Sequence, residues 1–216
     1  MSTSCGTLFA MPESALPRSS PLSLTVLSML GGGPLHPYEM QRRMKHWGKD
    51  QVVNLGQRAN LYKTIDRLHE AGLIAVHKTE REQRFPERTV YALTDEGLRV
   101  GREWLTDMLA TPRNEFPQFP AALSFIMGLT PEEAREVLER RAALLREHLA
   151  KLEGDLAWSQ SGLRPPRVAL LETEYLRAIT AAELSWIGGV IDDLKRGALT
   201  WSFEELAETA KSFLPT

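Results

Sequence analysis

The sequence predicts a mainly α-helical protein with one small β-hairpin and two domains. Apolar residues recur at a helical spacing over most of the chain, whereas the runs "LIAVHK" and "TVYALT" have the β-branched character of strands. Its 216 residues exceed the common size of a single domain. Charge also divides the chain: residues 36–102 hold 13 Lys and Arg against 9 Asp and Glu, and residues 103–216 hold 12 against 18. We expect a basic domain followed by an acidic helical domain.

The composition is that of an ordinary globular chain, with 43% hydrophobic and 25% charged residues. No apolar run approaches the roughly 20 residues that a membrane-spanning helix needs. Residues 1–21 have no basic start, and Ser and Pro break their apolar patches, so we expect a disordered tail and not a secretory signal. The single cysteine, Cys5, excludes a disulfide framework and a cysteine-based metal cluster, and it fits a reducing cytoplasm.

Two helices are expected before residue 50. The first ends at Gly31–Pro34, whose three glycines lack the Lys and Ser or Thr of a phosphate-binding loop and therefore indicate a helix stop. The second lies in "HPYEMQRRMKHWG" and places Met40, Met44 and Trp47 at spacings of 4 and 3. This spacing predicts a buried stripe, with basic side chains on the other side of the helix.

A third helix is predicted in "RANLYKTIDRLHEAGLI", residues 58–74. Its inward side is expected to hold Leu61, Ile65 and Leu68, which share one face at 100° per residue. The opposite face gathers hydrogen-bond donors of the kind that suit phosphates and purine edges in a DNA major groove. We expect Asn60, Lys63 and Arg67 to read bases, and Tyr62 and Thr64, on the flanks, to be phosphate or packing contacts.

The two strand-like runs flank the polar segment "TEREQRFPER", which predicts a hairpin with a long exposed tip. A helix followed at once by a basic hairpin is the layout of a winged helix. Arg81, Arg84 and Arg88 are expected to lie along a phosphate backbone, where they add affinity without sequence information. The alternative is a solvated loop in which the nearby glutamates, Glu80, Glu82 and Glu87, neutralise these arginines.

Three elements in order resemble the PadR family of bacterial transcriptional regulators. They are "HPYEMQRRM", "LYKTIDRLHEAGLI" and "RTVYALTDEG", within a match over roughly residues 22–105. The resemblance implies a winged helix-turn-helix domain over residues 22–112, with Tyr38 among the DNA contacts, and a helical dimerisation and effector domain over residues 113–216. Pro37 stands where the family usually has glycine, and Asn60 where Ser or Thr is common; an asparagine amide can pair with adenine.

The C-terminal region independently favours long helices. Thr130–Glu133 is a capping box, and it precedes a leucine repeat whose spacings of 4, 3, 4, 3 and 4 are those of a coiled-coil seam. The helix expected over residues 167–195 is apolar on two sides and so needs two partners. We expect a second subunit to be one of them, with a large monomeric helical domain as the alternative. The candidate dimer contacts are Leu138, Leu145, Leu149, Leu152, Tyr175 and Trp186.

The sequence does not favour an enzyme. Its five histidines show no paired metal spacing, and we find no nucleophile elbow and no cluster of catalytic carboxylates, so no cofactor, metal or catalytic residue is expected. The expected function is a homodimeric repressor that binds double-stranded DNA at an inverted repeat, and the family resemblance implies release by a small aromatic or amphipathic ligand. Trp104, Trp158 and Trp186 are candidates for lining an effector pocket, with core packing as the default. The alternative function is a winged-helix module that binds protein and not DNA.

Overall fold

The structure is a computed structural model that describes residues 16–49, 52–53, 58–80, 88–161 and 165–205. The chain divides into two compact units, unit 1 over residues 1–114 and unit 2 over residues 115–216. Most of the expected disordered tail lies outside the described residues. Residues 16–21 are described, and they are not a loose tail: Leu16 packs against the core of unit 1, and Pro21 begins the first helix.

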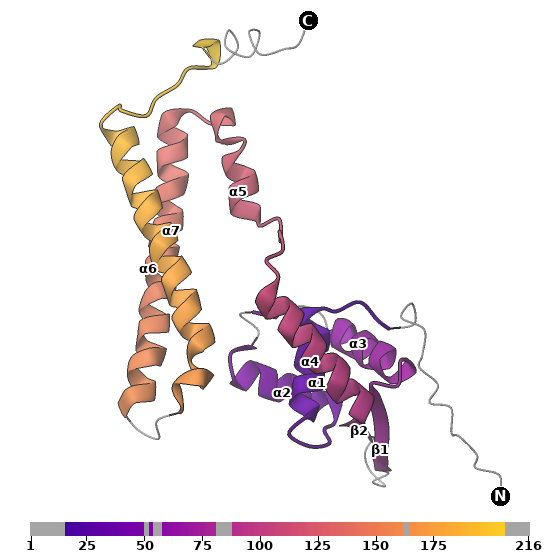
Figure 1. Cartoon of the computed structure of the whole chain (residues 1–216). Helices are drawn as coiled ribbons and strands as arrows, with labels where there is room; N and C mark the ends of the chain where they lie inside the picture. Colours follow the sequence, from indigo (N-terminus) through magenta and orange to yellow (C-terminus); the bar gives the residue numbers. More distant parts are fainter. Residues whose placement is uncertain (1–15, 50–51, 54–57, 81–87, 162–164, 206–216) are drawn as a thin grey trace, which may run out of the picture. The chain divides into compact units, whose positions relative to one another are not determined.

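Unit 1 is a helical domain with a two-stranded antiparallel sheet (Figure 1). Its elements in chain order are α1 (Pro21–Leu30), α2 (Pro37–His46), α3 (Arg58–Glu70), β1 (Ile74–Glu80), β2 (Arg88–Leu93) and α4 (Asp95–Ala110). Gly72, with φ of +71°, turns the chain from α3 into β1. The mainly α-helical fold with a small hairpin is therefore confirmed, and so is the order of helices and strands of a winged helix.

The hairpin pairs Ile74 with Leu93 at one end and Glu80 with Arg88 at the other, with an irregularity between Val76 and Lys78. Leu35, just before α2, adds a further backbone bridge to the middle of β2: its N–H donates to the Tyr91 carbonyl at 2.9 Å, and it accepts from the Tyr91 N–H at 3.0 Å. The start of α2 is thereby fixed to the sheet.

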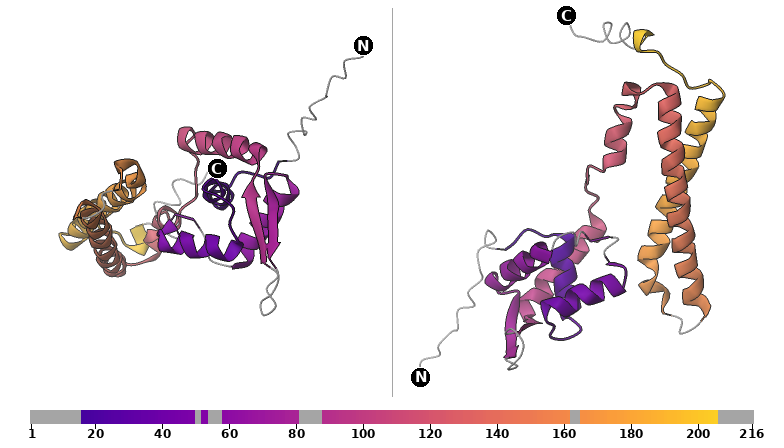
Figure 2. Two further views of the ribbon diagram at one scale, coloured as in Figure 1. Left: turned by 90° about the horizontal axis from the view of Figure 1, so that it is seen from below. Right: turned by 180° about the vertical axis from the view of Figure 1, so that it is seen from behind.

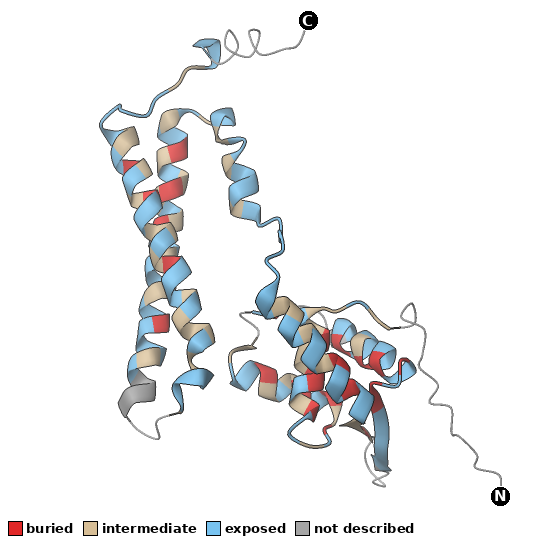
Figure 3. Cartoon of the chain, viewed as in Figure 1, coloured by how far each residue is buried: buried red, intermediate tan, exposed pale blue. Residues whose placement is uncertain are grey.

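Buried residues gather where the helices of unit 1 meet, as Figure 3 shows in red. Met40 and Met44 are fully buried, as the helical spacing predicts, but Trp47 is 54% exposed. The prediction for Trp47 was wrong because α2 ends at His46. Trp47 is the C-cap residue, with φ −91° and ψ 8°, and so no longer follows the helical stripe.

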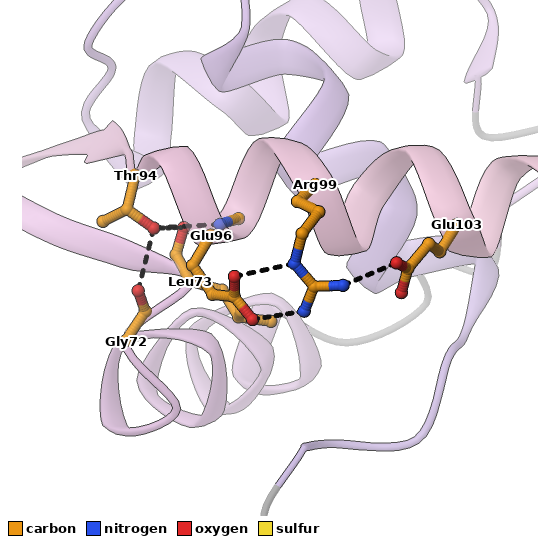
Figure 4. Close-up of polar contacts among 7 residues, drawn as sticks. Gly72, Leu73, Thr94, Glu96, Arg99 and Glu103 are labelled. Atoms are coloured by element: carbon orange, nitrogen blue, oxygen red, sulfur yellow. Dashed lines mark hydrogen bonds and ion pairs between the residues drawn. The ribbon is translucent and has the colours of Figure 1, made fainter. Parts of the chain in front are cut away.

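Thr94 joins the start of α4 to the turn between α3 and β1 (Figure 4). The Thr94 hydroxyl lies 2.8 Å from the Gly72 carbonyl oxygen and 2.9 Å from that of Leu73, and it accepts the Gly97 N–H at 3.0 Å. A Cβ atom on Gly97 would lie only 1.9 Å from the Leu73 carbonyl oxygen. The helix can therefore approach the chain this closely only where residue 97 has no side chain.

Unit 2 is built on two long helices that run side by side, as Figures 1 and 2 agree. Its elements are α5 (Gln118–Leu123), η3 (Ile126–Gly128), α6 (Pro131–Ser161), η4 (Arg167–Ala169) and α7 (Leu171–Lys195). The core between α6 and α7 contains Leu138, Ala142, Ile187 and Ile191. The predicted capping box is confirmed, because Thr130 N–H donates to Glu133 Oε2 at 2.8 Å and Glu133 N–H to Thr130 Oγ1 at 3.2 Å.

Within the described residues, no helix combines the length and apolar character needed to cross a membrane.

Candidate nucleic-acid interface

The outward face of α3 carries the three predicted base-reading residues. Asn60, Lys63 and Arg67 are all exposed. Beneath them, Leu61, Ile65 and Leu68 are almost completely buried in the core of unit 1. No ion pair joins Lys63 or Arg67 to another described residue. The structure thus holds this face rigidly from below and leaves its donors available to a partner.

The flanks of α3 differ in what they can offer. Tyr62 is exposed and carries a phenol at the rim of the helix. Thr64 is half-buried, and its hydroxyl donates to the Asn60 carbonyl oxygen at 2.8 Å. Because that proton is already committed to the helix backbone, the Thr64 hydroxyl is left only as an acceptor.

The start of α2 is set by a histidine cap that sequence reasoning did not identify. His36 Nδ1 accepts the Tyr38 N–H at 3.0 Å, and Pro37 occupies the first helical turn. Tyr38 is 55% exposed. The "HPY" stretch was visible in the sequence, but histidine is not among the common N-cap residues, so the pattern alone did not reveal the cap.

Two basic residues of α2 are already engaged. Arg43 Nε donates to Glu39 Oε1 at 2.9 Å, and Arg42 pairs with the same carboxylate. The pKa of Glu39 lies below its usual value because its carboxylate accepts hydrogen bonds from both arginines, and the bond from Arg43 has the larger effect. These arginines therefore differ from Lys63 and Arg67, which have no such carboxylate among the described residues.

The wing is described only where its strands begin and end. Arg81 and Arg84, like the neighbouring Glu82 and Glu87, lie outside the described residues. The backbone of Arg88 pairs with that of Glu80, but the side chains of both lie outside the description. The phosphate-contact role of the three arginines and the solvated-loop alternative both remain predictions.

The predicted dimer contacts fall into two groups. Leu138 and Leu152 are buried within the chain, and Leu145 and Leu149 are half-buried. Tyr175 and Trp186, by contrast, are 65% and 50% exposed on α7. Leu138 and Leu152 expose almost no side chain for a partner, because the seam they belong to is already covered inside unit 2. Tyr175 and Trp186 remain predicted dimer contacts.

The tryptophans proposed for an effector pocket have different surroundings. Trp104 is half-buried and packs against the core of unit 1. This is the core-packing role that the sequence predicts as the default for these tryptophans. Trp186 meets Phe119 edge to face, with ring centroids 6.2 Å apart, and the Arg141 guanidinium lies 3.7 Å from the centre of the Phe119 ring. The side chain of Trp158 lies outside the description. In the part of the chain that is described, no group of three or more His, Cys, Asp or Glu residues is placed to hold a metal ion.

Comparison with known proteins identifies the domain that carries α3. Residues 26–103 match the model of the family described as "Transcriptional regulator PadR-like family". Unit 1 carries a PadR-like domain. The match runs without a break from within α1 to within α4 and includes α2, α3 and both strands, and it confirms the resemblance seen in the three sequence elements.

Solved structures share the fold beyond the PadR-like domain. Bacillus subtilis PadR in complex with operator DNA has a TM-score of 0.65 at 21% identity, and the match covers 80% of this chain and 98% of that one. The same protein in complex with p-coumaric acid has a TM-score of 0.61 at 18% identity, and the match covers 82% of this chain and 99% of that one. The Vibrio cholerae virulence activator AphA has a TM-score of 0.58 at 16% identity, and the match covers 81% of this chain and 98% of that one. At these identities the likeness shows the fold alone. A sequence comparison with curated proteins finds no match.

Proposed function

We propose that this protein is a sequence-specific DNA-binding transcriptional regulator that reads its operator through α3. The observation that carries the proposal is the outward face of that helix, where Asn60, Lys63 and Arg67 are exposed above a closely packed apolar side. A major groove is wide enough to admit a helix, and amide and guanidinium groups pair with purine edges. The solved complex of Bacillus subtilis PadR with operator DNA supports the same use of the fold. Such a regulator would act in the bacterial cytoplasm.

The regulator acts as a homodimer in this proposal. The exposed apolar side chains of α7, which include Leu171, Tyr175, Ile179 and Trp186, supply a surface for a second copy. A twofold dimer presents two copies of α3 about 34 Å apart, one turn of B-DNA, so the operator is an inverted repeat.

Occupancy of such an operator blocks polymerase, so repression is the proposed output. The fold neighbour AphA is described as an activator, which makes the position of the operator relative to the promoter the deciding measurement. The complex of Bacillus subtilis PadR with p-coumaric acid supports control by a small aromatic ligand. Such a ligand releases DNA only by binding the DNA-incompetent arrangement more tightly.

Replacement of the outward face of α3 tests the proposal. We expect the triple variant Asn60→Ala, Lys63→Ala, Arg67→Ala to lose at least about 100-fold in operator affinity, because each well-formed base contact contributes roughly 1–3 kcal/mol of discrimination. The operator is first located by footprinting the DNA upstream of the gene, and affinity is then measured by fluorescence anisotropy at two salt concentrations. The preference of the triple variant for the operator over a scrambled duplex should also decrease.

The double variant Arg99→Ala, Arg102→Ala is the control for net charge, because it also removes two positive charges, both from exposed positions on α4, although Arg99 is paired with Glu96 and Glu103. Equal loss in both variants would mean that only net charge matters. The alternative function, a winged helix that docks on protein, has its own signature: the wild-type chain would bind no duplex at either salt concentration, whereas a DNA-binding protein loses affinity steeply as salt rises.

A further inference from the structure

A cavity of about 640 Å³ lies between the segment that precedes α1 and the second half of α3. One wall is formed by Pro17–Ser20 and Ser23, and the other by Thr64, Arg67, Leu68, Glu70 and Ala71. A hollow of this size, open to solvent, admits a group larger than a single ion. Arg67 belongs both to this wall and to the outward face of α3, so the cavity opens beside the surface proposed to meet DNA.

The N-terminal wall of the cavity is held in place at both ends. Leu16 packs against the core of unit 1. Ser20 caps α1, since its Oγ accepts the Ser23 N–H at 3.1 Å, and the hydroxyl oxygens of the two serines lie 2.8 Å apart. Arg18 lies between these anchors, so it is presented from an ordered segment and loses less conformational entropy when it binds a partner.

The charges around the cavity favour an anion. Arg18 and Arg67 are exposed, and neither makes an ion pair with another described residue. Arg99, on α4 of the same unit, is instead held between Glu96 and Glu103 (Figure 4). Glu70 is the acidic member of the lining, so the wall retains one more positive than negative side chain.

The chemistry of these groups is that of phosphate recognition. A guanidinium presents a planar fork of donors that matches two phosphate oxygens, and serine hydroxyls add neutral donors beside it. The positive end of α1, which follows Ser20, also favours negative charge at this wall.

We propose that this cavity holds a phosphate of the DNA backbone, with Arg18 as its cationic donor. The proposal rests on the proposed function, because the backbone must follow α3 for its phosphate to reach the cavity beside Arg67. Arg18 then sets the register of α3 on the duplex and adds affinity that does not depend on sequence.

Arg18→Ala tests this role without touching the base-reading face. We expect the variant to bind the operator and a scrambled duplex more weakly by the same factor, roughly tenfold at low salt, and the slope of log affinity against log salt to fall by about one. Arg18→Lys should keep most of the slope because it keeps the charge. Arg99→Ala, which removes an already paired arginine, should leave both affinity and slope unchanged.

The outcomes separate this proposal from the function on which it rests. If the wild-type chain binds no duplex, the proposed function itself fails. If the wild type binds and Arg18→Ala binds equally well with the same salt slope, the phosphate contact alone is overturned. A loss confined to the operator would also overturn it, because Arg18 would then be reading bases.

A titration with pyrophosphate, followed by NMR of the backbone amides of residues 17–23, distinguishes DNA from a free phosphate compound. Shifts that vanish in Arg18→Ala, together with the weaker duplex binding of that variant, support the backbone contact. Shifts that vanish while duplex binding is unchanged would assign the cavity to a free phosphate compound and refute the DNA contact.

Discussion

Gly97 is a single residue on which the assembly of unit 1 depends. A methyl group there would lie 1.9 Å from the Leu73 carbonyl oxygen and 2.9 Å from Leu93 Cδ1. We expect Gly97→Ala to destabilise unit 1 by about 3 kcal/mol, because either α4 or the start of β1 must shift to relieve the overlap. Thermal unfolding followed by circular dichroism measures the effect. The midpoint temperature of unfolding should fall by more than about 10 °C for a unit of this size.

Gly101 provides the matched control on the same helix. A Cβ atom there would lie 3.5 Å from Leu27 Cδ1, an ordinary contact distance. Gly101→Ala should therefore leave stability unchanged or raise it by up to about 1 kcal/mol, because alanine is the better helix former. Equal destabilisation by both substitutions would show that the close approach at residue 97 is not what limits the structure.

The sequence predicted the burial of single residues correctly where a periodic pattern spans the interior of a helix. It failed where burial or contact depends on the residue at which the helix ends or on two segments that meet in space. Met40 and Met44 were placed correctly because both lie inside α2. Trp47 was not, because the periodicity does not show that the helix stops one residue earlier. Gly97 was recognised as part of a motif, but its contact with Leu73 depends on two segments meeting in space, which spacing along the chain does not reveal.

The capping box at the start of α6 makes the stability of this element depend on pH. The pKa of Glu133 lies below its usual value of 4.5 because its carboxylate accepts hydrogen bonds from Thr130. The bond from the Thr130 N–H has the larger effect, and the bond from the Thr130 hydroxyl adds to it. Because the folded-state pKa is depressed, the contribution of Glu133 to stability is present above about 4.5 and is lost as the pH falls through the lower folded value. We expect Glu133→Gln to be less stable than wild type at pH 7, with the difference shrinking toward pH 3 in urea unfolding curves.

Glu136→Gln is the control for this effect. Glu136 is exposed on the same helix and makes no ion pair with another described residue. Its replacement should change stability little at either pH. A gap between wild type and Glu133→Gln that stays constant across this range would mean that the carboxylate charge plays no part in the cap.

The leucine repeat of α6 shows how far a pattern specifies an element. Its spacing predicted a buried seam, and Leu138 and Leu152 are indeed buried. The predicted partner was a second subunit, whereas Leu138 packs in the core shared with Ile187 and Ile191 of α7. Heptad spacing states that a helix needs a partner along one side, but it carries no information on whether that partner comes from the same chain.

At the scale of the whole molecule, the exposed apolar side of α7 predicts the oligomeric state. Trp186 is 50% exposed, and Tyr175 lies on the same side three turns earlier. We expect Trp186→Glu to convert the proposed dimer to a monomer, because a carboxylate buried in an apolar contact would be left without a partner. Light scattering after size-exclusion chromatography measures the mass, and operator binding should weaken with the loss of one half-site.

Trp186→Phe keeps an aromatic side chain and should remain dimeric. The hypothesis fails if wild type, Trp186→Glu and Trp186→Phe all have the mass of a single chain at every concentration tested. Unit 2 would then be the monomeric helical domain that the sequence left as an alternative.

A tryptophan near the end of unit 2 has a consequence for the modular use of this protein. The Trp201 indole N–H donates to the Leu129 carbonyl oxygen at 2.9 Å, across 72 residues of sequence. The chain therefore leaves the α6 and α7 pair beside the point where it entered. A segment whose two ends meet can be excised and grafted as a cassette, so residues 129–201 should tolerate transplantation onto a different N-terminal domain.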